Sequence, residues 1–200
     1  MHIATTFPAM TTVPRERGAP PGDLAVWFFI CAELLVFGVF FLGYAIARRY
    51  DPELFNQGQA TLDTGAGLLN TLLLISSSYL VAKAVHALRD GRPRVAVWRL
   101  LGGIALGAGF LAVKTHEYGV QFDAGISLST STFSMFYLGL TMFHAMHVVL
   151  GMVVLAVLAW QSAAGHYGPG DCNGAESGAA YWHMVDLVWL ILFPLVYVIH

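Results

Sequence analysis

Charged residues are scarce in this 200-residue chain: they make up 11% of it, while hydrophobic residues make up 57%. A soluble domain carries roughly 25% charged residues, because it needs a wet, repulsive surface. The chain therefore has too few charged residues to form the surface of a soluble globular enzyme. Its formal net charge is −2, and its ten Lys and Arg residues form no long basic run. This excludes the electrostatic pattern of a nucleic-acid-binding protein, so we expect no nucleic-acid partner.

Cysteine and the common catalytic motifs are also scarce. The two cysteines, Cys31 and Cys172, form neither a metal-binding spacing nor a disulfide framework, so we expect both thiols to be unpaired. The sequence has no Gly-x-Ser-x-Gly motif and no Walker loop. Acyl transfer and phosphate binding therefore have no support from motifs.

Long apolar segments are abundant. Five of them can cross a hydrocarbon core of about 30 Å, which takes about 20 helical residues. They cover approximately residues 25–48, 67–88, 98–118, 132–160 and 179–199. The segments between them are too polar to lie in lipid, which predicts loops, including 51–64, 89–94 and 161–177. No segment alternates as the strands of a transmembrane barrel do, so we predict an all-α bundle of five transmembrane helices.

The N-terminal residues differ from the rest of the chain. Residues 1–22 contain four prolines and predict an irregular tail, whereas residues 23–200 predict a single transmembrane domain. Lys and Arg are enriched on the cytoplasmic side of membrane proteins. The tail and the connection after the second apolar segment hold six Arg residues, and the opposite side holds Arg48, Arg49 and Lys114. This bias predicts a cytoplasmic N-terminus and a C-terminus on the other side of the membrane.

One carboxyl group lies deep in the first apolar segment. Glu33 is about ten residues inside it, which is roughly 15 Å at a helical rise of 1.5 Å per residue, and no Lys, Arg or His lies within one turn. An ionisable group at mid-membrane costs about 2.5–3.5 kcal/mol on insertion scales. We therefore expect this carboxyl to be neutral for much of the time. It is either a proton-binding or regulatory group, or a structural group hydrogen-bonded to a neighbouring helix.

Histidines and acids recur at helical spacing. His144 and His147 are three residues apart and face the same side of the fourth segment, and His183 and Asp186 repeat the spacing on the fifth. These groups could ligate a metal with oxygen atoms from Glu117 or Glu176. We favour an interhelical hydrogen-bond network, because a single HxxH is a weak signal for a metal site. This network would comprise Glu117, His144, His147, Glu176, His183 and Asp186.

Small residues on the third segment favour close helix packing. Gly103 and Gly107 have the four-residue spacing that lets two helices approach. Transporters typically show internal repeats and broken helices, neither of which is present. A haem bundle needs facing ligands on separate helices at matched depth, whereas the two deep histidines lie on one segment. We therefore favour an accessory or assembly subunit. The alternatives are a metal-binding membrane oxidoreductase and a small proton-conducting transporter.

These polar positions resemble the cytochrome c oxidase subunit 3 family of the haem–copper oxidases. The stretch ESGAAYWHMVDLVW, residues 176–189, resembles the closing E-x4-YWH-x-VD-x-VW signature of that family. TMFHAMHVVLGM resembles its TG-x-HxxHV-x-x-G motif, and Glu33 matches the carboxyl of its SE-type motif. Lys114 departs from the pattern, because many oxidase members have Gln there.

The resemblance implies a subunit that has no haem or copper of its own. This multi-pass subunit would belong to a complex in the bacterial inner membrane, with its C-terminus in the periplasm. Its partner would be the catalytic subunit I, which holds haem and copper. Subunit III would stabilise subunit I and influence proton entry. PPGDLAVWFFICAELLVFGVFF and LLNTLLLISSS look more like the nitric-oxide-reductase-associated branch, for which the partner would be the reductase large subunit. Membrane lipids, including a bound phospholipid, are the other implied partners. The chain has five helices where mitochondrial-type members have seven, which puts the lipid cleft of the family in doubt.

Overall fold

A computed structural model of the chain describes residues 23–168 and 170–199. The predicted tail, residues 1–22, lies outside the described residues. Within them the chain is helical, and it forms five long helices that are long and apolar enough to cross a membrane. These are α1 (Leu24–Tyr50), α3 (Thr64–Arg89), α4 (Pro93–Asp123), α5 (Thr132–Ala163) and α6 (Asn173–Phe193). The prediction of an all-α transmembrane bundle of five helices is confirmed.

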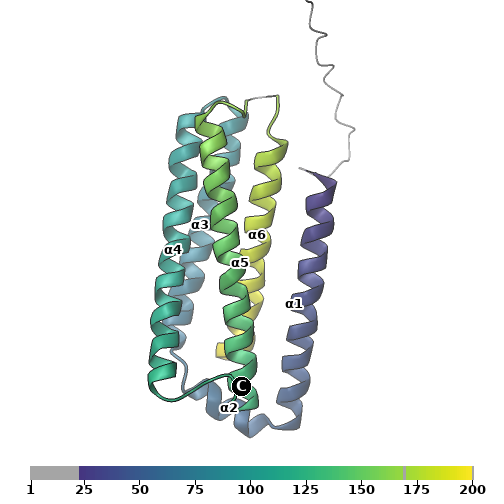
Figure 1. Cartoon of the computed structure of the whole chain (residues 1–200), viewed down its shortest axis with the longest axis vertical. Coiled ribbons are helices and arrows are strands. Elements are labelled where there is room, and N and C mark those ends of the chain that lie inside the picture. Colours follow the sequence, from purple (N-terminus) through teal and green to yellow (C-terminus); the bar gives the residue numbers. More distant parts are fainter. Residues whose placement is uncertain (1–22, 169, 200) are drawn as a thin grey trace, which may run out of the picture.

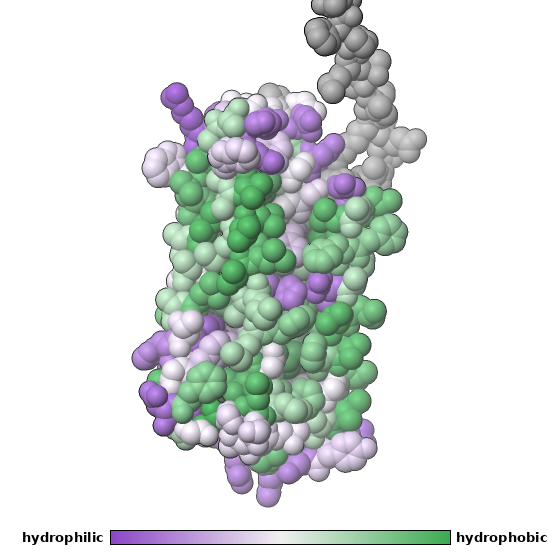
Figure 2. Space-filling view, in the orientation of Figure 1, coloured by the Kyte–Doolittle hydropathy of each residue, from purple (hydrophilic) through white to green (hydrophobic). Residues whose placement is uncertain are grey.

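The five long helices run side by side along the long axis (Figure 1). Helices α3, α4, α5 and α6 pack closely against one another, and α1 lies along α6 and α5 at one side. The side chains of α1 that are buried recur every seventh residue, at Ile30, Phe37 and Tyr44. This is a narrow contact stripe, so most of the surface of α1 faces outward. A wide hydrophobic belt separates two hydrophilic ends, as a membrane protein requires (Figure 2).

Local capping signals set the helix starts and the turns between helices. The side chains of Asp23, Asp63 and Ser131 accept hydrogen bonds from backbone N–H groups in the first turns of α1, α3 and α5. The connections after α3, α4 and α5 each contain a glycine with φ between 70° and 78°, at Gly91, Gly125 and Gly165. Only glycine adopts this left-handed conformation without strain, and this explains why the helices stop there.

Two segments differ from the predicted loops. Segment 51–64 contains the nine-residue helix α2 (Pro52–Ala60), because Asp51 caps it and proline suits the first helical position. Helix α6 begins at Asn173, six residues before the predicted start at 179. It continues into a π-helical turn, η1 (Pro194–Val198), where proline removes a backbone donor from the regular pattern. Gln59 of α2 donates to the carbonyl oxygen of Val196 at 2.9 Å and so ties α2 to η1.

Candidate functional site

Glu33 on α1 pairs with His147 on α5. His147 Nε2 is 3.0 Å from Glu33 Oε2, and the two side chains are 10% and 19% exposed. His147 lies at the middle of the 32-residue helix α5, so the pair is at mid-membrane depth. Glu33 has no Lys, Arg or His within one turn on α1, but it has an ionisable partner on α5.

The second ring nitrogen of His147 determines how many protons this pair holds. His147 Nδ1 lies 2.8 Å from the carbonyl oxygen of Phe143, and it must donate because a carbonyl oxygen only accepts. If the imidazole is neutral, Nε2 is then the acceptor and Glu33 must be protonated. If the imidazole is charged, Nε2 donates to an ionised Glu33. Both arrangements hold one transferable proton and have no net charge, which lowers the cost of placing the pair in the membrane.

A second carboxyl, Glu117 on α4, lies in a closed cluster. Its Oε1 accepts hydrogen bonds from the hydroxyls of Tyr137 and Tyr197, both at 2.6 Å, and its Oε2 is 3.0 Å from Lys114 Nζ. Lys114 also donates to the Tyr197 hydroxyl at 2.7 Å. All four side chains are buried, and we call them the Glu117 cluster. The cluster joins α4 to α5 and to η1.

The orientation count assumed that Lys114 lies at the membrane surface, and the structure shows that it does not. It is 0% exposed, and α4 continues to Asp123, nine residues beyond it. The ammonium nitrogen lies 5.1–5.4 Å from the centroids of four aromatic rings, those of Tyr118, Tyr137, Trp189 and Tyr197. Ring faces and the Glu117 carboxylate together compensate the loss of water around this charge. Lys114 therefore does not contribute to the charge bias between the two ends.

His144 connects α5 to α6. Its Nε2 donates to the carbonyl oxygen of Val185 at 3.0 Å, and its ring contacts those of Phe110 and Trp189. The side chain is fully buried, and Nδ1 has no hydrogen-bond partner among the described residues. A hydrogen bond from Trp189 Nε1 to Thr71 Oγ1, at 3.0 Å, continues the contact to α3.

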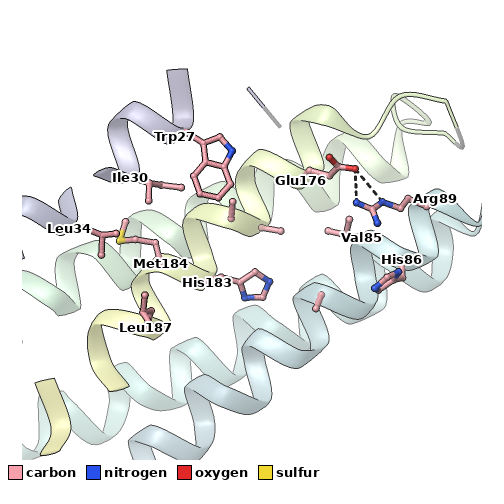
Figure 3. A pocket seen from close by; sticks show the side chains of 13 residues that line it. Trp27, Ile30, Leu34, Val85, His86, Arg89, Glu176, His183, Met184 and Leu187 are labelled. Carbon is pink, nitrogen blue, oxygen red and sulfur yellow. Dashed lines mark hydrogen bonds and ion pairs between the residues drawn. The ribbon is translucent and has the colours of Figure 1, made fainter. Parts of the chain in front are cut away.

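His183, Asp186 and Glu176 face α3 from α6. Ser78 Oγ lies 2.5 Å from His183 Nδ1 and also interacts with Asp186, whose Oδ1 has no partner in the described part of the chain. Glu176 Oε1 accepts from Arg89 at 2.8 Å, at the hydrophilic end of the same helix pair. Figure 3 shows this ion pair at one end of a groove of about 470 Å³ between α1, α3 and α6.

Gly103 and Gly107 lie where α4 contacts other helices. The carbonyl oxygen of Gly103 accepts from Ser77 Oγ at 2.8 Å. A Cβ atom at Gly107 would lie 2.9 Å from the ring of Trp182, so a larger residue does not fit. Gly103 lets α4 approach α3, whereas Gly107 leaves room for the Trp182 side chain of α6 and for Met152 of α5.

Both cysteines are free. Cys31 is exposed on α1, and Cys172 is buried just before α6, where its Sγ donates to the carbonyl oxygen of Gly168 at 3.2 Å. Burial raises the pKa of the Cys172 thiol, which keeps the thiol protonated and unreactive.

The contacts of the six predicted network residues lie at several helix interfaces, and three of them, Glu176, His183 and Asp186, share the interface between α6 and α3. Several of the partners of these six residues were not among the predicted site residues: Lys114, Tyr137, Tyr197, Ser78 and Arg89. The spacing of Lys114 and Glu117, three residues apart on one helix, is the one sequence signal that indicates such a pair. The tyrosines come from distant segments and had no comparable signal.

Comparison with known proteins shows the family. A family model described as "Cytochrome c oxidase subunit III" matches residues 6–200. The chain belongs to the cytochrome c oxidase subunit III family. It is 34% identical to cytochrome c oxidase subunit 3 of Synechocystis over 176 residues, 87% of this chain and 74% of that protein. Identity to the Thermostichus vulcanus protein is 31% over 178 residues, 88% of this chain and 86% of that protein. Identity to the Danio rerio protein is 32% over 198 residues, which are 96% of this chain and 74% of that protein.

Membership of the subunit III family confirms the resemblance read from the motifs. Subunit III of this family has no redox cofactor of its own. Among the described residues, no group of three or more His, Cys, Asp and Glu side chains could hold a metal ion. The relatives named above are oxidase subunits, so the likeness to the nitric-oxide-reductase branch stays a prediction.

Proposed function

We propose that this non-catalytic subunit III of a haem–copper oxidase packs against a catalytic subunit I, which holds the haem and copper, in the bacterial inner membrane. Its role there is to stabilise the catalytic subunit and to support proton uptake. Family membership is the observation that carries this proposal, and the arrangement of the buried polar groups supports it.

The buried polar groups support the stabilising role. Inside a bilayer the hydrophobic effect does not drive helices together, so close packing and hydrogen bonds must do so, at roughly 0.6 kcal/mol for an average interhelical hydrogen bond. The Glu117 cluster, the bond from His144 to α6 and the bond from Ser78 to His183 each join different helices. A bundle held in one shape by these contacts presents a constant surface to its partner.

The Glu33–His147 pair supports a role in proton uptake. It holds one proton that can move across a 3.0 Å hydrogen bond, and the Glu33 side chain is 19% exposed. The Glu117 carboxyl, in contrast, is closed in by three bonded partners, Lys114, Tyr137 and Tyr197. Of the two carboxyls, Glu33 is the one placed to exchange a proton with its surroundings.

The charge distribution supports a cytoplasmic N-terminus and a periplasmic C-terminus. With the buried Lys114 left out, six Arg residues on the N-terminal side stand against Arg48 and Arg49 on the other. The bias toward a cytoplasmic N-terminal side is therefore larger than the sequence count alone indicates.

The groove in Figure 3 supports a bound phospholipid. Arg89 is half-exposed at its hydrophilic end and can face a phosphate group, while Trp27, Ile30 and Leu34 of α1 line the apolar remainder. A head group would then lie at the membrane surface and an acyl chain along α1.

Purification of the tagged chain in a mild detergent tests the proposed function. We expect a larger assembly with haem absorption and a catalytic oxidase subunit, and we expect the isolated chain to have no Soret band. A chain that is always recovered alone under gentle conditions would contradict the proposal. So would stoichiometric iron or copper in the isolated chain.

A further inference from the structure

A groove on the surface between α1 and α5 leads to the Glu33–His147 pair. The groove has a volume of about 350 Å³, and apolar side chains of α1 and α5 line it above small residues of α6. Glu33 and His147 lie one helical turn beyond its lining residues Phe29 and Leu150. Figure 2 shows a hydrophilic patch that interrupts the hydrophobic belt at mid-height, between α5 and α1.

Two polar groups at this place lack a hydrogen-bond partner within the described chain. Glu33 Oε2 is bonded to His147, while the other carboxyl oxygen, Oε1, has no bond to a described residue. Tyr181 lines the groove, and its buried hydroxyl has no partner among residues 23–168 and 170–199. A polar atom that remains unpaired in hydrocarbon is unfavourable. The Tyr181 hydroxyl is buried beneath the groove surface, whereas the Glu33 side chain is 19% exposed, so an occupant that supplies a hydrogen-bond donor can reach Glu33.

The depth of these groups identifies the class of occupant. The polar atoms of a lipid lie at the head group, about 15 Å from the middle of a 30 Å hydrocarbon core, so an acyl chain beside Glu33 cannot supply a donor. A transmembrane helix can carry a Ser, Thr, Asn, Gln, Tyr or Trp side chain at any depth. The groove in Figure 3 differs, because its Arg89–Glu176 pair lies at the membrane surface, where lipid head groups are.

We propose that the α1–α5 groove is the docking surface for a transmembrane helix of the catalytic subunit, and that this helix carries an N–H or O–H donor facing Glu33 Oε1. The proposal rests on the proposed function and adds the face through which the partner is bound. Gly174, Ser177 and Gly178 of α6 form the floor of the groove, so side chains of the arriving helix can enter between α1 and α5.

Photo-crosslinking in the intact complex tests the docking face. A benzophenone amino acid is placed at Leu150, which lines the groove and is 46% exposed, and in a control at Leu72 on α3, which is 55% exposed. We expect a several-fold higher yield of catalytic-subunit adduct from Leu150 than from Leu72. Equal yields, a higher yield from Leu72, no adduct from either, or lipid adducts alone from Leu150 would each overturn the proposal.

Two substitutions at Glu33 test the polar contact. Glu33→Gln keeps one acceptor for the partner and one donor for His147, whereas Glu33→Leu keeps neither. We expect the Leu variant to retain several-fold less catalytic subunit during purification and the Gln variant to retain the wild-type amount. The melting temperature of each isolated chain shows that it is folded. Equal retention by both folded variants would overturn the polar contact, while a wild-type chain without any haem-containing partner would instead contradict the proposed function.

Discussion

Glu117 in the tightly packed helices α3–α6 and Glu33 on helix α1 have different surroundings. Glu117 on α4 accepts two tyrosine hydroxyls and pairs with a fully buried lysine. Glu33 on α1 has one partner, His147, and remains partly exposed. The packing of the two regions differs in the same way, since α1 buries a stripe of three side chains and α6 buries thirteen.

The number of partners is the reason to propose a structural role for Glu117 and proton exchange for Glu33. Moving a proton onto Glu117 would disturb several contacts at once, because its donors are fixed on three elements. A proton that moves within the Glu33–His147 pair changes one hydrogen bond and leaves the net charge of the pair at zero. We therefore propose that the tightly packed region provides rigidity and that Glu33 on α1 is the group that exchanges a proton.

The largest effect is expected for Lys114→Met. This substitution leaves the Glu117 carboxylate buried without its counter-charge, and breaking such a pair costs about 3–5 kcal/mol. For a chain of this size, each kcal/mol lowers the melting temperature by roughly 2–4 °C. Thermal unfolding of the detergent-solubilised chain should therefore show a decrease of about 10 °C.

The double variant Lys114→Met/Glu117→Gln is the matched control. A glutamine oxygen still accepts from Tyr137 and Tyr197 but carries no charge that needs Lys114. We expect it to melt well above the single variant. If the double variant melted no higher than Lys114→Met, the charge pair would not be the source of stability in this region.

An intermediate effect is expected for Gly151→Ala in the tightly packed region. The added Cβ would lie 2.7 Å from the Trp182 ring, which also lies close to Gly107 of α4. Overpacking of this kind costs about 1–3 kcal/mol. At Gly38 on α1 an added Cβ meets nothing within 4 Å, so Gly38→Ala should not lower the melting temperature. Equal losses in the two variants would mean that α1 is as tightly packed as α3–α6.

The sequence was sufficient to predict the five membrane-spanning helices, because the length of an apolar segment alone decides whether it can cross a bilayer. It did not reveal α2, because the polar composition of 51–64 concealed the capping signal of Asp51 and Pro52. The burial of Lys114 was also missed. The apolar segment was expected to end near residue 118, whereas α4 continues to Asp123 and places Lys114 about 13 Å from its end.

For the candidate site, the sequence identified single residues but not their partners. Glu33 and His147 were both recognisable as polar groups in apolar segments. Their pairing joins positions 114 residues apart and depends on how α1 lies against α5, which no local pattern encodes. The same holds for Tyr197, whose position follows from the π-helical turn after Pro194.

A small effect on stability is expected for Glu33→Gln, which keeps the hydrogen bond to His147 because an amide N–H can donate to Nε2 of the neutral imidazole. The melting temperature should stay within about 2 °C of wild type, since an average interhelical hydrogen bond contributes roughly 0.6 kcal/mol and this one is retained. Reaction with an apolar carbodiimide, which modifies protonated carboxyl groups from the lipid side, should nevertheless be lost. Peptide mapping of the wild-type chain should then find the label on Glu33 and none on Glu117, because the bonded tyrosines and lysine close off the second carboxyl. Label on Glu117 at a comparable rate would remove the distinction between the two regions.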